Sequence, residues 1–170
     1  MEKPPKPVIN PGRSKLDHWT KGSLYESRDI AFGQLLGLKN LGIGYSEVPP
    51  GKSGCPFHSH HVEEELFVIL EGNGTYRFGE TRHPVGPGDV LGAPAGGAET
   101  AHHLINTGEV PLKYLSISTM AATEICEYPD SGKFLAKTRK ETGGPVEFRY
   151  TGRVESAVDY WEDEPGADEA

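Results

Sequence analysis

The sequence predicts an all-β fold, a sandwich or jelly-roll barrel built from short strands. The 170 residues include 22 glycines and 14 prolines, which favour many turns over long helices. Runs of apolar or alternating character and of strand length recur roughly every ten residues, with turn residues between them. No helix of ordinary length is evident, and no internal repeat suggests a second domain.

The chain divides into three parts by composition. Residues 1–29 are expected to form an N-terminal arm, because their first half is rich in proline and lysine. Residues 30–152 carry the strand patterns and form the expected barrel domain. Residues 153–170 form an acidic tail, whose Tyr160-Trp161 pair is apolar enough to dock on the barrel or on a partner.

The centre of the expected barrel domain has the clearest strands. Glu65 to Glu71 has the Phe-, Val- and Ile-rich composition of a buried strand. Gly72-Asn73-Gly74 provides turn residues, and Thr75 to Phe78 returns with alternating character, so we expect a β-hairpin. Further strands are expected within 30–50, where 41–46 alternates, and at 90–91, 101–106, 112–118 and 146–150.

The net charge of −8 belongs mainly to the tail. Seven acidic residues and no Lys or Arg follow Arg153, so the rest of the chain is close to neutral. A near-neutral body without a basic stripe argues against binding to nucleic acid or to anionic lipid. The longest apolar run, Leu66 to Leu70, is too short to span a membrane, and the N-terminus does not resemble a secretory signal, so we expect a cytoplasmic protein.

The two cysteines, Cys55 and Cys126, are far apart in the sequence. In a cytosolic chain such a pair is more often reduced and structural than bridged. Cys55 lies three residues before His58, but its spacing to the histidines fits no zinc-finger pattern, so we do not include it among the ligands.

Two segments carry residues that suggest a metal site. In the first, His58 and His60 are two residues apart, so on a strand their side chains leave the same face. Glu65 opens the next expected strand and offers an oxygen ligand. In the second segment, His102 brings a third imidazole from a distant strand. Imidazole mixed with carboxylate suits Mn, Fe, Co, Ni or Zn, and affinity order alone does not choose among them.

These residues resemble the cupin family. Its first motif is a glycine, His-x-His, three or four residues, Glu, six residues and Gly; here four residues separate His60 from Glu65, and six separate Glu65 from Gly72. Its second motif is similar to Gly88, Pro94-Ala95-Gly96, His102 and Asn106, although five residues lie between Gly96 and His102 where the family usually has two. The resemblance covers about 48–118 and extends, more weakly, to small single-barrel cupins with a Tyr-Pro-Asp-Ser-Gly stretch, here 128–132, and a Tyr-Trp ending.

The resemblance implies a double-stranded β-helix barrel, one divalent metal ion on His58, His60, Glu65 and His102, and a homodimer. Glu64 is the alternative to Glu65 as ligand, and Glu63 or Glu64 could transfer protons if either reaches the mouth, with Glu64 our choice. Strand alternation places His61 and His103 on the opposite face from the ligands. Arg77 could hold a carboxylate inside the barrel but is more simply a solvated strand residue.

Three functions stay open. The first is a metal-dependent enzyme, most simply of dioxygenase type, that acts on a small organic acid or carbonyl compound. The second is a sugar or keto-enol isomerase with the same metal. The third is a non-catalytic module that binds a sugar or a hormone-like acid. A barrel of this kind hosts many chemistries, so the resemblance does not decide among them.

Overall fold

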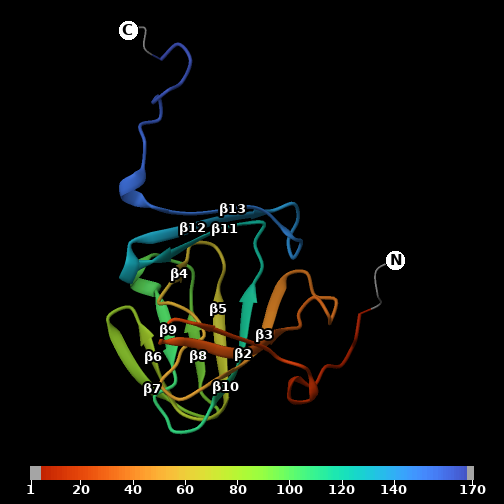
Figure 1. Ribbon diagram of the computed structural model, residues 1–170. Helices are drawn as coiled ribbons and strands as arrows, with labels where there is room; N and C mark the ends of the chain where they lie inside the picture. The colour runs from red at the N-terminus through yellow and green to blue at the C-terminus, as the bar shows by residue number, and fades with distance from the viewer. Residues whose placement is uncertain (1–4, 168–170) are drawn as a thin grey trace.

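The computed structural model describes residues 5–167 (Figure 1). Strands dominate this part of the chain, and its helices are single turns of 3₁₀ type. The strands are β1 (Asp17–Lys21), β2 (Tyr25–Ala31), β3 (Leu41–Val48), β4 (Ser59–His60), β5 (Glu65–Glu71), β6 (Gly74–Phe78), β7 (Thr81–Val85), β8 (Val90–Ala93), β9 (His102–Ile105), β10 (Leu112–Thr119), β11 (Thr123–Tyr128), β12 (Lys133–Arg139) and β13 (Val146–Arg153). The 3₁₀ turns are η1 (Pro11–Arg13), η2 (Ala98–Thr100), η3 (Pro129–Ser131) and η4 (Val154–Ser156).

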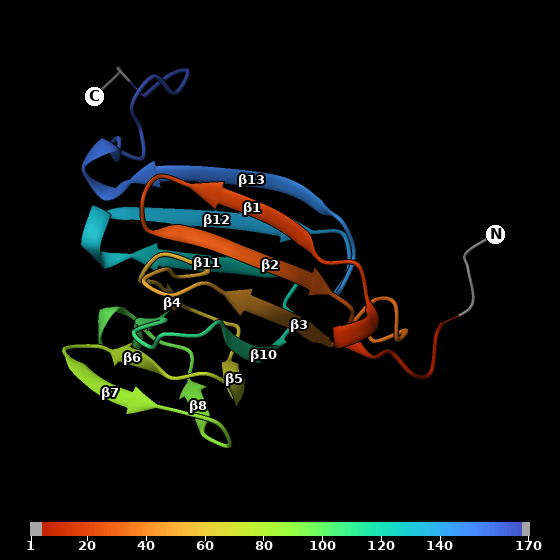
Figure 2. The same ribbon diagram turned by 60° about the horizontal axis from the view of Figure 1, so that its bottom comes forward.

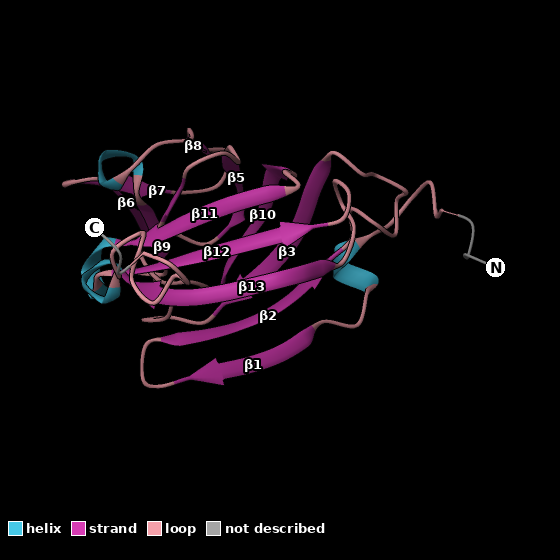
Figure 3. Cartoon of the chain, turned by 90° about the horizontal axis from the view of Figure 1, so that it is seen from above, coloured by secondary structure: helices cyan, strands magenta, loops and turns pink. Residues whose placement is uncertain are grey.

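The strands form three sheets, all antiparallel. A six-stranded sheet has the order β1-β2-β3-β10-β5-β8, a four-stranded sheet the order β13-β12-β11-β4, and a three-stranded sheet the order β7-β6-β9. A bridge between His58 and His102 links the four-stranded to the three-stranded sheet. Figures 2 and 3 show β1, β2 and β3 in order along one sheet and β11, β12 and β13 in order along another. This is the expected all-β, double-stranded β-helix architecture.

The hydrophobic core fills the space between the six-stranded and three-stranded sheets. The six-stranded sheet contributes inward residues of β3, β5, β8 and β10, and the three-stranded sheet contributes residues of β6, β7 and β9. Alternation along each strand sends every second side chain to this core. Its buried members are Val48, Phe67, Ile69, Tyr76, Val85, Leu91, Leu104, Leu112 and Tyr114.

The expected hairpin between 65–71 and 75–78 is wrong. Strand β5 pairs with β10 and β8, whereas β6 pairs with β7 and β9. Gly72 has φ 81°, and a Cβ atom there would lie 2.6 Å from the Pro111 carbonyl oxygen. The turn residues therefore take the chain from one sheet to the other, since the sharp corner needs a positive φ and a close backbone approach.

The expected N-terminal arm is too long. Strands β1 and β2 form a hairpin inside 1–29, and β2 pairs with β3, so the six-stranded sheet begins at Asp17. The hairpin is tied across its strands, because the Trp19 indole Nε1 donates to Asp29 Oδ2 at 2.7 Å. Residues 1–4 of the arm lie outside the described residues.

The acidic tail leaves the barrel after β13 (Figure 1). Tyr160 and Trp161 are 81% and 64% exposed, and their rings contact each other edge to face at 4.8 Å. The expected docking of this pair on the barrel is therefore wrong, and docking on a partner stays a prediction. The last three residues of the tail, 168–170, lie outside the described residues.

No helix in residues 5–167 has the length and apolar character needed to cross a lipid bilayer.

Candidate metal centre

Two of the predicted ligand histidines are brought together by a backbone bridge. The main-chain N–H of His58 donates to the carbonyl of His102 at 3.1 Å, and the N–H of His102 donates back at 2.7 Å. Their rings consequently lie side by side, with centroids 4.4 Å apart. His60 follows two residues after His58, so strand alternation turns its ring to the same side, 4.9 Å from that of His58.

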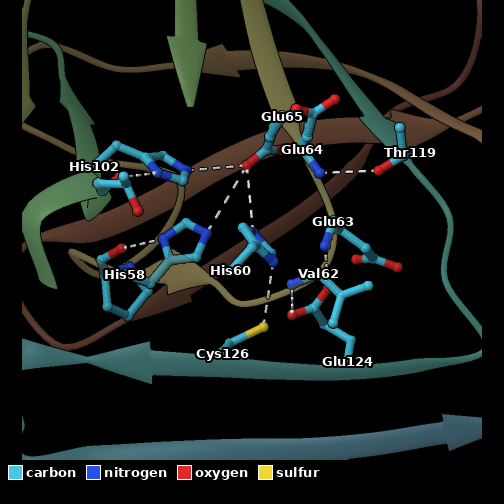
Figure 4. A network of polar contacts seen from close by, with 12 residues as sticks. His58, His60, Val62, Glu63, Glu64, Glu65, His102, Thr119, Glu124 and Cys126 are labelled. Atoms are coloured by element: carbon cyan, nitrogen blue, oxygen red, sulfur yellow. Dashed lines mark hydrogen bonds and ion pairs between the residues drawn. The ribbon is translucent and has the colours of Figure 1, made fainter. Parts of the chain in front are cut away.

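Glu65 completes the group from the six-stranded sheet, at the start of β5. Its Oε2 atom lies 3.1 Å from Nε2 of His102, 3.6 Å from Nε2 of His60 and 3.9 Å from Nε2 of His58 (Figure 4). All four ligand atoms lie within 4.8 Å of one another. Neighbouring ligands about 2.1 Å from one ion sit roughly 3 Å apart, so these residues fit a divalent metal with little movement.

The ionisable residues of the group differ in the direction of their pKa shifts. Burial by itself would raise the pKa of Glu65, but hydrogen bonds and charges from His102, His60 and His58 outweigh it and lower the pKa to about 2. Burial, together with the neighbouring histidines, lowers the pKa of His58 to about 4. Burial would lower the pKa of His60, but its contacts with Cys126 and Glu65 outweigh this and raise it to about 10. At neutral pH the site therefore holds a carboxylate and a neutral His58, whereas His60 gives up a proton when a metal binds.

The residues next to the ligands face elsewhere. His61 is exposed, with Nε2 3.1 Å from Glu127 Oε1. His103 is buried, but its register partner in β6 is Arg77, on the outer face of that sheet. Strand alternation explains why His102 and not His103 lies in the group.

The two other acidic residues of the first segment differ from Glu65 and from each other. Glu63 is buried, its Oε1 accepts the N–H of Ala121, and its Oε2 lies 3.1 Å from Lys137 Nζ, so it fastens β12 to the loop. Glu64 is exposed and points away from the histidines (Figure 4). It shares with Glu65 the lining of a cavity of about 340 Å³ at the ends of β5, β8 and β10.

The cysteines have different places. Cys55 is not among the clustered ligand atoms of the described residues, and burial raises the pKa of its thiol to about 12, so it is held as a neutral thiol. Cys126 is buried on β11, and its Sγ lies 3.4 Å from Nδ1 of His60. Our sequence reasoning missed this contact and missed β11 altogether. The alternation Glu124, Cys126, Tyr128 is the one signal in the sequence that could have indicated it.

Arg77 is not the solvated residue that the sequence favoured. Its guanidinium makes two hydrogen bonds to the Asp130 carboxylate, at 2.6 and 3.0 Å, and lies 3.5 Å from the centroid of the Phe57 ring. Asp130 belongs to the 128–132 stretch noted in the sequence, so this stretch is anchored to the three-stranded sheet. Neither residue faces the four ligands.

Comparison with known proteins places this site in a family. Residues 44–118 match the family model of the cupin domain, Cupin_2. Auxin-binding protein 1 of Arabidopsis thaliana is 34% identical over 131 residues, which cover 73% of this chain and 60% of that protein. The oxalate-binding protein of Thermotoga maritima is 32% identical over 71 residues, 42% of this chain and 55% of that protein. The chain covers 54–60% of the length of the curated relatives it matches.

A solved structure is similar over most of the chain. The structure comes from Acidithiobacillus ferrooxidans and is provisionally described as a sugar phosphate isomerase. It superposes with a TM-score of 0.71 at 26% identity, covering 87% of this chain and 90% of that one. The protein is thus a small single-domain β-barrel with a His/Glu group that could hold a metal ion. It belongs to the cupin superfamily.

Proposed function

We propose that the protein binds one divalent metal ion through His58, His60, Glu65 and His102 and acts as a metal-dependent enzyme on a small organic acid or carbonyl compound. The observation that carries this proposal is the convergence of three Nε2 atoms on one carboxylate oxygen. When bound, a divalent ion would supply Lewis-acid polarisation of a substrate oxygen. Mn, Fe, Co, Ni and Zn all suit this donor set, so the identity of the metal is left open.

Charge near the ligands supports an anionic substrate. The Tyr128 ring stacks on that of His58, with centroids 6.1 Å apart. The Lys133 ammonium lies 5.5 Å from the Tyr128 ring centroid. Burial raises the pKa of Tyr128, and the positive charge of nearby Arg149 opposes that rise, which places a second cation close by. One end of a small anion could therefore meet the metal while Lys133 and Arg149 neutralise the other.

For the reaction we propose isomerisation, a proton shift next to a carbonyl group, in place of the dioxygenase-type oxidation that the sequence favoured. The support is the 26% identity, over most of both chains, to the structure described as a sugar phosphate isomerase. A proton shift needs a side chain that exchanges protons with the substrate. Glu64 stays the predicted residue for this role, although its carboxylate points away from the histidines in this structure (Figure 4). Glu63 is occupied by Lys137 and the Ala121 N–H.

The test is deuterium exchange. Protein loaded with Mn²⁺, Fe²⁺, Ni²⁺ or Zn²⁺ is incubated in D₂O with a panel of aldose and ketose phosphates and keto acids. We expect deuterium to enter one substrate next to its carbonyl without oxygen uptake, and Glu64→Gln to slow the exchange at least tenfold. Exchange that needs oxygen would support the dioxygenase alternative, and turnover in neither assay would remove the proposal of an enzyme.

A second function, non-catalytic binding of a small acid, is favoured by two curated relatives whose names describe binding, of auxin and of oxalate. Both relatives exceed 30% identity, although each match covers only part of the relative. The expected result for a binding module is a rise in melting temperature with oxalate or indole-3-acetate that requires the metal and is accompanied by no turnover.

The predicted homodimer finds support in the outer face of the six-stranded sheet. Strand β5 is apolar on both faces, as in sheets covered on both sides, yet only its inner face meets the core. The outward residues of five strands form two apolar cross-strand rows, in which Tyr45 is already buried within the chain: Ile30, Tyr45, Leu115, Val68 and Val90, and next to them Ile43, Ile117 and Leu66.

A second copy fits this face because the next row alternates in charge, as Arg28, Glu47, Lys113 and Glu71. A two-fold axis parallel to the strands would reverse the row and oppose each charge with its opposite. Sedimentation equilibrium should show a dimer that Val68→Lys dissociates; a monomeric wild type would refute it. A cytoplasmic location also stays a prediction, which cell fractionation would test.

A further inference from the structure

Each ligand histidine presents Nε2 to the centre of the group, so its Nδ1 atom needs a separate partner. For His58 this partner is the main-chain carbonyl of Pro56, 2.9 Å away. For His102 it is the carbonyl of Thr100, 3.4 Å away. In both cases the carbonyl belongs to the residue two positions earlier, so the local backbone orients the ring.

His60 differs, because its Nδ1 faces a side chain from another strand. The Cys126 Sγ atom lies 3.4 Å away (Figure 4). Cys126 is 4% exposed and is the register partner of His60 between β11 and β4, so the strand pairing itself sets this contact. An imidazole that binds a metal through Nε2 carries its proton on Nδ1, and here that proton can be donated only to sulfur or left unpaired.

The same face of β11 supports the site at two further points. Two residues before Cys126, the Glu124 carboxylate accepts the main-chain N–H groups of His61, Val62 and Glu63, at 3.0, 3.3 and 2.6 Å. Two residues after it, Tyr128 stacks on His58. The inward face of β11 therefore meets the ligand-bearing segment along its whole length.

His60, Glu124 and Cys126 also satisfy the distance test for a metal group of their own. Two observations argue against a second ion there. Both Glu124 oxygens already accept main-chain N–H groups, and Glu124 is fully buried. In addition, His60 is needed by the first group, and a bridging imidazole would have to lose both ring protons.

We propose that Cys126 is a positioning residue for the metal: its sulfur accepts the Nδ1–H of His60 and so holds the tautomer and ring angle that aim Nε2 at the ion. This inference rests on the proposed metal centre. A hydrogen-bonded partner behind a metal-bound histidine typically contributes 10–100-fold to metal affinity. The backbone carbonyls behind His58 and His102 cannot be removed by substitution, so His60 is the one ligand whose support can be tested directly.

The experiment compares Cys126→Ala and Cys126→Ser with the wild type and with Cys55→Ser as the matched cysteine control. Metal-free protein is titrated with Co²⁺ under reducing, anaerobic conditions, and affinity, stoichiometry and the visible absorption spectrum are measured. We expect Cys126→Ala to weaken Co²⁺ binding about 10–100-fold and to shift the visible bands. Cys126→Ser, which keeps an acceptor, should recover most of the affinity, and Cys55→Ser should match the wild type.

Circular dichroism of the metal-free proteins distinguishes a variant that has unfolded from one in which only the orientation of His60 has changed. Cys126→Ser keeps the test valid if the alanine variant unfolds. Wild-type affinity and spectrum in Cys126→Ala would overturn the proposal. A sulfur-to-cobalt charge-transfer band would make Cys126 a ligand, and two ions per chain would make the cluster a second site; either result also overturns it. A wild type that binds no Co²⁺ would remove the metal centre itself, a result distinct from these.

Discussion

Two neighbouring histidines of β9 show how different the two faces of one strand are. His102 is 1% exposed, and its Nε2 lies 3.1 Å from a carboxylate oxygen of Glu65. His103 is 6% exposed, and its Nε2 has no hydrogen-bond partner among the described residues. Burial, with the nearby Arg77 charge, lowers the pKa of His103 to about 4. His102 and His103 are the same residue type and are almost equally buried, so the face of β9 that each occupies decides whether it joins the candidate metal group.

The comparison extends to the other ligands. His60 belongs to the ligand group whereas His61 pairs with Glu127 at the surface, and Glu65 belongs to the group whereas Glu64 is exposed. Because strand alternation has a period of two, a register shift of one residue would exchange every member of these pairs. The inner face carries the group that could hold a metal ion, and the outer face carries ion pairs.

The largest expected effect separates the two β9 histidines. His102→Ala should weaken binding of Co²⁺ or Zn²⁺ at least 100-fold, since it removes one of four ligand atoms and leaves Glu65 with fewer partners. His103→Ala should leave affinity within about threefold of the wild type, because it removes nothing from the ligand group. Isothermal titration of metal-free protein measures both; equal losses in the two variants would mean that the faces are not separate.

The next largest expected effect is on the free energy of unfolding at acidic pH. The pKa of His103 in the folded protein is about 4, below its ordinary value of about 6.5, so the unfolded chain takes up the proton first as the pH falls. The stabilisation due to neutral His103 is therefore complete above pH 6.5 and is lost as the pH falls towards 4. We expect this loss to amount to about 2 kcal/mol in the free energy of unfolding.

Urea unfolding in the presence of chelator, from pH 7 to pH 4.5, should show this loss reduced in His103→Gln. The exposed His83 provides the control, and His83→Gln should follow the wild type. A His103→Gln variant with the full wild-type acid dependence would contradict the assignment of His103 to a buried, neutral state.

The smallest effect concerns the ion pair of Arg77 with Asp130 on the outer face. A double-mutant cycle of Arg77→Ala and Asp130→Ala should give a coupling of about 0.5–1 kcal/mol, since the pair is two-pronged but partly exposed. The single contact of Lys113 with Glu71 has similar exposure and should give less. Metal affinity should not change in any of these variants, and a change would show that the outer face supports the site.

Sequence alone was enough to select the four residues of the candidate metal group and most of the barrel strands. The spacing of two between His58 and His60 is a local property of strands, and the motif resemblance selected Glu65 over its acidic neighbours. Sequence was not enough for the hairpin predicted at Gly72, because a glycine turn looks the same whether it returns to its own sheet or crosses to the facing one. The contact of Gly72 with Pro111 is non-local and decided that question.

The sequence by itself determined the all-β class, the strand alternation and the residues of the candidate metal group, since these depend on periods of a few residues. Only the tertiary structure determined the contacts around this group. These are the Cys126 thiol next to His60, the hydrogen bonds from the main chain of residues 61–63 to Glu124, and the ion pair of Asp130 with Arg77. Each of these joins residues more than 50 positions apart, and such pairings follow from sheet order and register, which no local pattern specifies.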